Sequence, residues 1–181
     1  MNPKLKLAAI VTAMLVLPVA HAATMTPADY SASKSRISDV YKTDKGACSS
    51  QTGNAKDVCI EEAKAKEKVA RAELEYNRSG KAADQTKVAQ VRARTTYAVA
   101  KERCDDQAGN PKDVCVKEAK AIEEKALADA KLGKQVGEAR SDASQSKMDA
   151  DYEVATQKCD AMAGDAKNSC IAAAKARFRK G

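Results

Sequence analysis

Polar and apolar positions repeat along this chain about every 55 residues, and each repeat has the pattern of helices. Every copy contains a tyrosine, a cysteine, a glycine and a second cysteine at the spacing Y-x6-C-x4-G-x5-C. Small or apolar residues follow the second cysteine by one and by four positions, which places them along one side of a helix. The three copies are Tyr41, Cys48, Gly53 and Cys59; Tyr97, Cys104, Gly109 and Cys115; and Tyr152, Cys159, Gly164 and Cys170.

The segment between the two cysteines predicts the tip of a helical hairpin. Its glycine suits a left-handed residue that ends the first helix, and the next residue is a plausible N-cap for the second. Pro111 then falls at the first helical position, where its missing N–H costs little. Asp57 and Asp113 fall near the capping-box position. The predicted N-caps are Asn54, Asn110 and Asp165.

The spacing also predicts how the cysteines pair, because each lies about one turn from the tip and faces the other across the hairpin. Fifteen pairings of six cysteines are possible, and the repeat selects Cys48–Cys59, Cys104–Cys115 and Cys159–Cys170. A disulfide holds two Cα atoms about 5.5 Å apart, closer than packed helices usually lie. Small neighbours permit this approach, and the predicted interface residues are Ala63, Ala119 and Ala174, flanked by Ile60, Val116 and Ile171.

We therefore expect an all-α fold of three tandem antiparallel helical hairpins, each stapled by one disulfide, after a cleaved signal peptide. Thr26 and Pro27 predict the first helix start. A break is expected at residues 77–80, and a second where Gly133 and Gly137 loosen the chain before a cap at Ser141. The repeats are 23–79, 80–135 and a truncated 136–181, and the expected helices span 27–52, 55–77, 83–108, 111–132, 141–163 and 166–181. Sparse aliphatic residues leave open whether the hairpins form a bundle or an extended array.

Residues 1–22 have the pattern of an export signal. Lys4 and Lys6 precede the apolar run Leu7–Val19, and Ala20-His21-Ala22 forms a small-residue cleavage site. We expect the mature chain to begin at Ala23, to keep no membrane anchor, and to reside in a bacterial periplasm or outside the cell. Such a compartment is oxidising, which favours three structural disulfides.

Composition narrows the chemistry further. The formal net charge is +7 with a single histidine, and the predicted cleavage removes His21, so no histidine-dependent catalytic mechanism remains. The charges of both signs are mixed along the chain, unlike the concentrated positive charge of a nucleic-acid-binding protein. Ten residues separate each cysteine pair, whereas catalytic dithiols favour Cys-x-x-Cys. We expect no enzyme activity, no cofactor, no metal site and no nucleic-acid partner.

Pairs of adjacent carboxylates recur along the chain, at Glu61-Glu62, Asp105-Asp106 and Glu123-Glu124. Neighbouring side chains on a helix point in different directions and do not converge, so these pairs predict solvated helix faces.

Two sets of repeated residues are candidate surface contacts. The lysines near each tip suggest a basic surface for anionic envelope polymers or lipid headgroups, although duplication of one ancestral hairpin explains their recurrence as well. The tyrosines lie two turns before each first cysteine, where they suit packing anchors better than an aromatic patch for a glycan or partner. These candidates are Lys56, Lys112 and Lys167, and Tyr41, Tyr97 and Tyr152.

The signal peptide, the Ala/Lys/Glu-rich helices and segments such as Gly53–Cys59 resemble a group of small exported proteobacterial proteins, often labelled TolA-like cell-envelope biogenesis proteins. This resemblance implies a place in the cell envelope and no particular functional residues. We expect a non-enzymatic helical scaffold or interaction module whose partner is an envelope protein or an anionic envelope polymer. Two alternatives are a chaperone-like binder of unfolded clients and a redox-responsive disulfide protein.

Overall fold

The computed structural model describes residues 25–180, and this range is helical with no strand. The all-α prediction is therefore confirmed for the described residues. The predicted signal peptide lies outside them. The elements are α1 (Pro27–Ala47), the short 3₁₀ turn η1 (Cys48–Ser50), α2 (Gly53–Ser79), α3 (Ala82–Cys104), α4 (Gly109–Cys159) and α5 (Gly164–Phe178).

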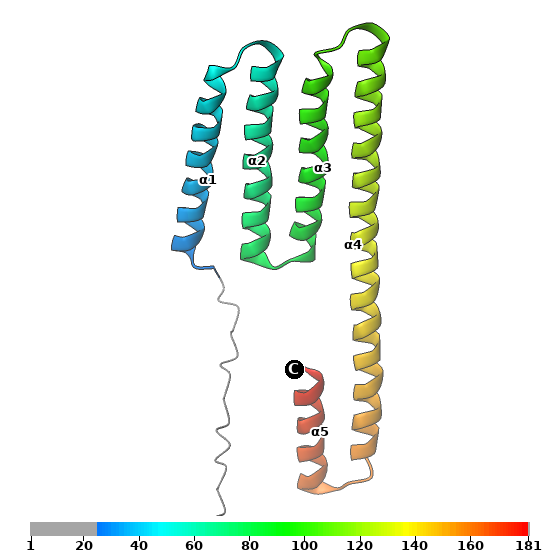
Figure 1. Cartoon of the computed structure of the whole chain (residues 1–181). Coiled ribbons are helices and arrows are strands. Elements are labelled where there is room, and N and C mark those ends of the chain that lie inside the picture. The colour runs from blue at the N-terminus through cyan, green and yellow to red at the C-terminus, as the bar shows by residue number, and fades with distance from the viewer. Residues whose placement is uncertain (1–24, 181) are drawn as a thin grey trace, which may run out of the picture.

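The helices form an open array in which each packs only against its neighbours along the chain. Within residues 25–180, α1 contacts α2, α2 contacts α3, α3 contacts α4 and α4 contacts α5, and no other pair of these helices meets. Helices α1 to α4 therefore lie side by side in one antiparallel layer, while α5 folds back along the far end of α4 (Figure 1). This arrangement answers the question that the sparse aliphatic residues left open: the hairpins do not close into a bundle.

The first helix begins, and the turn between the first two hairpins falls, where the sequence predicts. The hydroxyl of Thr26 accepts a hydrogen bond from the backbone N–H of Asp29 at 3.1 Å, and Pro27 opens α1. At the other turn, Gly80 adopts a left-handed φ of 61° and donates its N–H to the carbonyl of Tyr76. A residue without Cβ adopts this conformation at little cost, so Gly80 ends α2 and reverses the chain.

The glycines at the three hairpin tips do not end the preceding helices, which corrects the sequence prediction. The preceding helices already finish at or just before the first cysteine, and each glycine lies at the start of the next helix with φ between 56° and 61°. The residue before each glycine is extended and takes the N-cap position, without a side-chain hydrogen bond, instead of the predicted caps. These N-cap residues are Thr52, Ala108 and Ala163.

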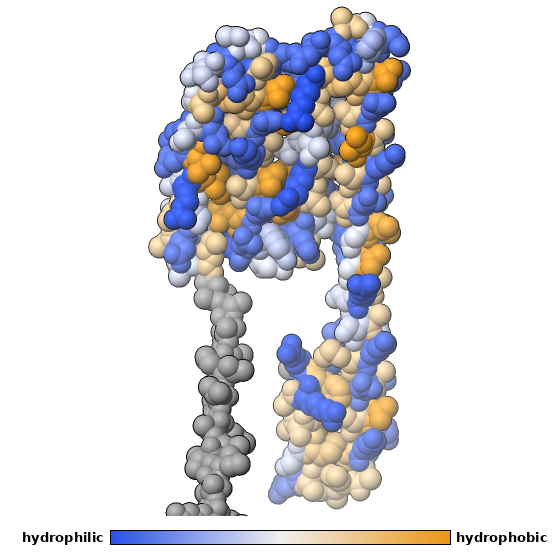
Figure 2. Space-filling model, in the orientation of Figure 1, coloured by the Kyte–Doolittle hydropathy of each residue, from blue (hydrophilic) through white to orange (hydrophobic). Residues whose placement is uncertain are grey.

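The predicted break around Gly133 and Gly137 is wrong, because α4 is one continuous helix of 51 residues. Neither glycine has a positive φ, and a glycine inside a helix costs only about 1 kcal/mol relative to alanine. The expected helices 111–132 and 141–163 are therefore two halves of α4, which belongs to both the second and the third hairpin. Residues 131–147 of this helix are all exposed. Their first part lines a groove with the start of α3, and beyond it Figure 2 shows α4 standing clear between the four-helix layer and α5. We call residues 131–147 the arm.

Small residues dominate the thin core of the array. The predicted interface alanines are buried in all three hairpins, together with one cysteine of each disulfide and a few larger side chains on α2 and α3. Alanine at these positions lets the helix backbones approach as closely as a disulfide requires. The core residues are Cys48, Ala63, Ala72, Leu74, Ala93, Val99, Cys104, Ala119, Cys159 and Ala174.

Candidate functional site

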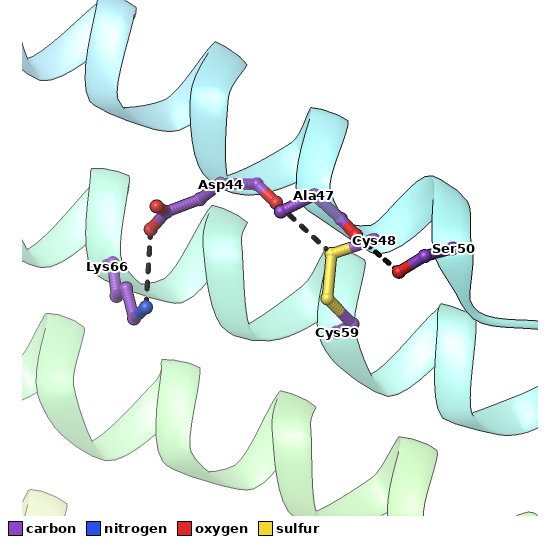
Figure 3. The surroundings of a disulfide bond; sticks show 6 residues. All are labelled: Asp44, Ala47, Cys48, Ser50, Cys59 and Lys66. Atoms are coloured by element: carbon purple, nitrogen blue, oxygen red, sulfur yellow. Dashed lines mark hydrogen bonds and ion pairs between the residues drawn. A yellow bond between two sulfur atoms is a disulfide. The ribbon is translucent and has the colours of Figure 1, made fainter.

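Three disulfides join the helices at the hairpin tips, in the pairing that the repeat predicts. Each links cysteines eleven positions apart with a Cα–Cα distance of 5.7 Å, and no free cysteine remains. Figure 3 shows the first of them, with Ser50 donating a hydrogen bond to the carbonyl of Ala47 and Lys66 of α2 paired with Asp44 of α1. The first cysteine of every pair is buried. The second cysteine of every pair is half-buried, so access of an outside thiol to the first sulfur is restricted.

The backbone turn after the first cysteine has the same form in all three tips. The carbonyl of each first cysteine accepts a hydrogen bond from the backbone N–H three residues later, at 3.0–3.1 Å. The donors are Gln51, Gln107 and Met162. The repeated tip is therefore one structural unit, defined by a disulfide, a short turn and a left-handed glycine.

Two of the three tip lysines are engaged in ion pairs across their own tip. Lys112 lies 2.8 Å from Asp105, and Lys167 lies 3.0 Å from Asp160. The hydrogen bond to the Asp105 carboxylate raises the pKa of Lys112 above its ordinary value. In the first repeat, Ser49 occupies the position of these aspartates, and Lys56 has no such partner there. The tips therefore do not present three equivalent lysines, because Lys112 and Lys167 are paired within their own tips and Lys56 is not.

The three repeated tyrosines are half-buried, each with a lysine amine near its ring. The amine-to-centroid distances are 6.0 Å for Lys45 and Tyr41, 5.1 Å for Lys120 and Tyr97, and 5.8 Å for Lys180 and Tyr152. A cation within about 6 Å of a ring is attracted by its quadrupole. Each tyrosine lies seven residues from its cysteine, about 10 Å along the helix, so the tyrosines and tip lysines are not gathered into one surface.

The neighbouring carboxylates have separate partners. Glu61 pairs with Lys64 on its own helix, while Glu62 reaches across to Arg103 of α3. Glu123 is buried beside Lys120, and the adjacent Glu124 is exposed. Among residues 25–180, no three His, Cys, Asp or Glu side chains come together in a way that could hold a metal ion.

A different site emerges where α1, α2 and α3 lie together. A groove of about 560 Å³ crosses these helices, with a floor of small and apolar side chains that includes Ala72, Leu74 and Val91. Tyr30 lies among its lining residues, and its hydroxyl donates a hydrogen bond to Glu75. This bond to a carboxylate raises the pKa of Tyr30. Cations surround the floor, and we call this site the basic groove: its charged residues are Lys34, Lys68, Arg71, Lys87, Arg94 and Glu75.

The basic groove differs in charge from the neighbouring groove on the same array. The groove between α3 and α4 is lined by two cations, Arg92 and Lys134, and by two acids, Glu123 and Asp129. The basic groove has five cations and a single acid, and that acid is shared between Tyr30 and Arg78. Positive charge therefore predominates in the basic groove and not in the groove between α3 and α4.

Most of this positive charge is uncompensated. Arg71 is held by Glu67 at 2.7 Å and by the hydroxyl of Ser38 at 2.9 Å. The other four cations are exposed, and none of them lies within 4.0 Å of a carboxylate oxygen of the described chain. These four are Lys34, Lys68, Lys87 and Arg94.

This groove is not evident from the sequence alone, because its cations come from three helices and belong to no motif. The repeat does contain a signal. Three of the cations have acidic residues at the equivalent positions of the following repeat, while the cysteine, glycine and alanine positions around them are unchanged. Lys68 corresponds to Glu124, Lys87 to Asp142 and Arg94 to Asp149. These three cations are therefore not part of the repeated pattern.

No helix within residues 25–180 contains an apolar stretch sufficient to cross a membrane. In comparisons with protein-family models, with curated protein sequences and with solved structures, no match to this chain was found.

Proposed function

We propose that this protein is a non-enzymatic scaffold of the bacterial cell envelope, exported to the periplasm or beyond, which holds two packed units at a fixed separation. The observation that supports this proposal is the arm. It is a stretch of 17 residues of α4 that are all exposed, with a length of about 25 Å at the helical rise. Of these residues, Gly133, Lys134 and Gly137 line the groove beside α3. The four-helix layer lies at one end of the arm and the third hairpin at the other.

The disulfides stabilise the four-helix layer and the third hairpin, which lie at the two ends of the arm. Three staples in 156 described residues fit an oxidising, exported environment. They also support a fold with few buried aliphatic side chains, because a cross-link reduces the entropy of the unfolded chain. A scaffold needs fixed geometry more than a large core, and stapled hairpins on a continuous helix supply it.

Photo-cross-linking in the cells that produce the protein tests this proposal. A photoreactive residue is introduced at Arg94 on the layer, at Val154 on the third hairpin, or at Ala143 within the arm as the control. A scaffold yields discrete adducts at Arg94 and Val154, with different partners at the two positions, and few adducts at Ala143.

Two other results count against the scaffold. A broad mixture of adducts that grows under heat stress, together with suppression of client aggregation by the purified protein, indicates a chaperone-like binder. Adducts that change when the cells are exposed to a reductant indicate a redox-responsive protein. Cell fractionation of the same strains measures export directly, since a chain retained in the cytoplasm contradicts the proposed location.

A further inference from the structure

We infer that the basic groove binds a single-chain anionic amphiphile, a molecule with one carboxylate or phosphate head group on an apolar chain. This inference goes beyond the scaffold proposal and does not depend on it. It identifies a ligand site on the layer formed by α1, α2 and α3.

The charge arrangement points to an anion. Four exposed cations without carboxylate partners converge on one groove from three helices: Lys34 from α1, Lys68 from α2, and Lys87 with Arg94 from α3. Other cations of the array pair with acids of the adjacent helix, as Arg92 does with Glu73 and Arg103 with Glu62, and further cations without a carboxylate partner are spread along exposed helix faces instead of lining one groove. Unpaired like charges that face one groove repel each other, and a bound anion relieves this repulsion.

The floor points to an apolar group attached to that anion. Ala72, Leu74, Val91 and Ala98 line the groove, and the hydroxyl of Thr95 is already bonded to the carbonyls of Val91 and Arg92. The floor therefore offers no spare polar group from these residues. A hydrated polyanion gains only from the cations, whereas an alkyl chain also gains from leaving water for this floor. The volume of about 560 Å³ lies in the range of small-molecule sites.

The head group and the chain have separate places in this groove. Lys87 and Arg94 lie seven residues apart on one face of α3, about 10 Å along the helix, and Lys68 approaches from α2. Lysine and arginine at this spacing suit a carboxylate or phosphate head group at the rim. The alkyl chain of the ligand then lies along the floor toward Tyr30. Leu74 is buried in the core of the layer, so the alkyl chain of the ligand covers this side chain and does not displace it.

Isothermal titration with decyl phosphate, kept below its micelle concentration, is the experiment that tests this assignment on the oxidised mature chain. Inorganic phosphate and decyl maltoside serve as the matched probes for the head alone and for a neutral amphiphile. We expect saturable binding of decyl phosphate, at least tenfold tighter than either matched probe and weaker at higher salt. Along a series of alkyl phosphates, affinity should rise about twofold per methylene. Full burial of a methylene gives roughly fourfold, and in an open groove about half of each methylene is buried.

The residues at the equivalent positions of the following repeat suggest a variant that removes the charge of the groove. K68E, K87D and R94D together introduce the residues that the chain already has at the equivalent positions, all at exposed sites. This triple variant should lose at least tenfold in affinity for decyl phosphate. The control K117E, K125D and K147D makes the same change in net charge at exposed positions of α4 and should bind as the parent does.

Several results overturn the assignment. Equal binding by the groove variant and the control shows that the amphiphile associates nonspecifically. Inorganic phosphate as tight as decyl phosphate shows a plain anion site without a role for the floor, and decyl maltoside as tight as decyl phosphate shows a site without a role for the charges. Helical content measured by circular dichroism confirms that each variant is folded. These outcomes are separate from the cross-linking pattern, so the ligand and the scaffold can fail independently.

Discussion

Val99 and Val154 occupy the same position of consecutive repeats, two residues after the tyrosine, yet 9% of Val99 is exposed and 55% of Val154. Val99 lies on α3, where it lines the junction with Ala65 and Lys66 of α2. Val154 lies on α4 beyond the arm, where only α5 packs against the helix. The third hairpin therefore lacks the neighbour that α2 provides to the second.

This difference predicts different costs for one substitution. Val99→Ala should lower the free energy of unfolding by about 1–2 kcal/mol, because it removes buried apolar surface. Val154→Ala should change the stability by less than about 0.5 kcal/mol, as exposed substitutions usually do. Urea unfolding followed by circular dichroism measures both. Equal costs would show that Val154 is covered in solution, by a second copy or by a rearranged third hairpin.

The glycines predict a second contrast. Gly137 is helical with open space at its Cβ position, whereas Gly109 has a φ of 61°. Gly137→Ala should stabilise α4 by about 0.5–1 kcal/mol. Gly109→Ala should destabilise the second hairpin by about 1 kcal/mol or more, because a Cβ disfavours the left-handed region.

Urea unfolding measures both glycine variants, and limited proteolysis offers an independent measurement on Gly137→Ala. Cleavage within the arm should slow in Gly137→Ala, since local opening of the exposed helix precedes cleavage. Faster cleavage in this variant would instead show that Gly137 adopts a nonhelical conformation in solution.

The continuous helix through Gly137 shows which parts of the fold can be predicted from the sequence and which cannot. Repetition of the Tyr-Cys-Gly-Cys spacing predicts the hairpins and the cysteine pairing, because these features depend on local geometry within a dozen residues. The same repetition suggests a turn between the second and third hairpins, since Gly80 makes such a turn between the first and second. Here Gly133 and Gly137 lie among good helix formers, and the helix persists through them.

The basic groove was beyond the sequence prediction for a different reason. Its cations are up to 60 positions apart, from Lys34 to Arg94, and only the order of the helices in the layer brings them together. The ion pair at the second tip could not be predicted from the sequence for a similar reason. Lys112 and Asp105 are recognisable as a pair only after the turn between α3 and α4 is known, whereas from the sequence Lys112 resembles a free surface charge.

The disulfides should differ in what they stabilise. Each closes a loop of about a dozen residues, which corresponds to somewhat under 3 kcal/mol in the chain-entropy model. Helix α3 also packs against α2, so Cys104→Ser with Cys115→Ser should loosen the second tip and leave the layer folded. Helix α5 packs only against α4, so Cys159→Ser with Cys170→Ser should release it.

Amide hydrogen exchange measures this difference helix by helix. Loss of protection confined to α5 in the third-hairpin variant, with α3 still protected in the second-hairpin variant, is the expected result. Global unfolding of the second-hairpin variant would show that the layer depends on its staple and not on packing between α2 and α3.

The C-terminal end of α5 should respond to acid through one contact. Lys180 donates a hydrogen bond to Asp149 at 2.5 Å, and Gln145 donates another at 2.6 Å. These bonds, the one from Lys180 first, lower the pKa of Asp149 below its ordinary value. A lowered folded-state pKa means that the contact stabilises the fold above the unfolded pKa of about 3.9 and is lost as the pH falls below it. Lys180 also lies over the ring of Tyr152, so its release is observable at that tyrosine.

We therefore expect the NMR signals of Tyr152 and of the last turn of α5 to shift as the pH falls from about 4 toward 2, with the midpoint below 3.9. Asp149→Asn should remove this transition and leave the neutral-pH signals of α1 to α3 unchanged. Lys180→Ala should raise the Asp149 midpoint toward the ordinary aspartate value, because it deletes the largest cause of the lowered pKa. An unaltered midpoint in Lys180→Ala would assign the acid response to another carboxylate and place the end of α5 away from α4 in solution.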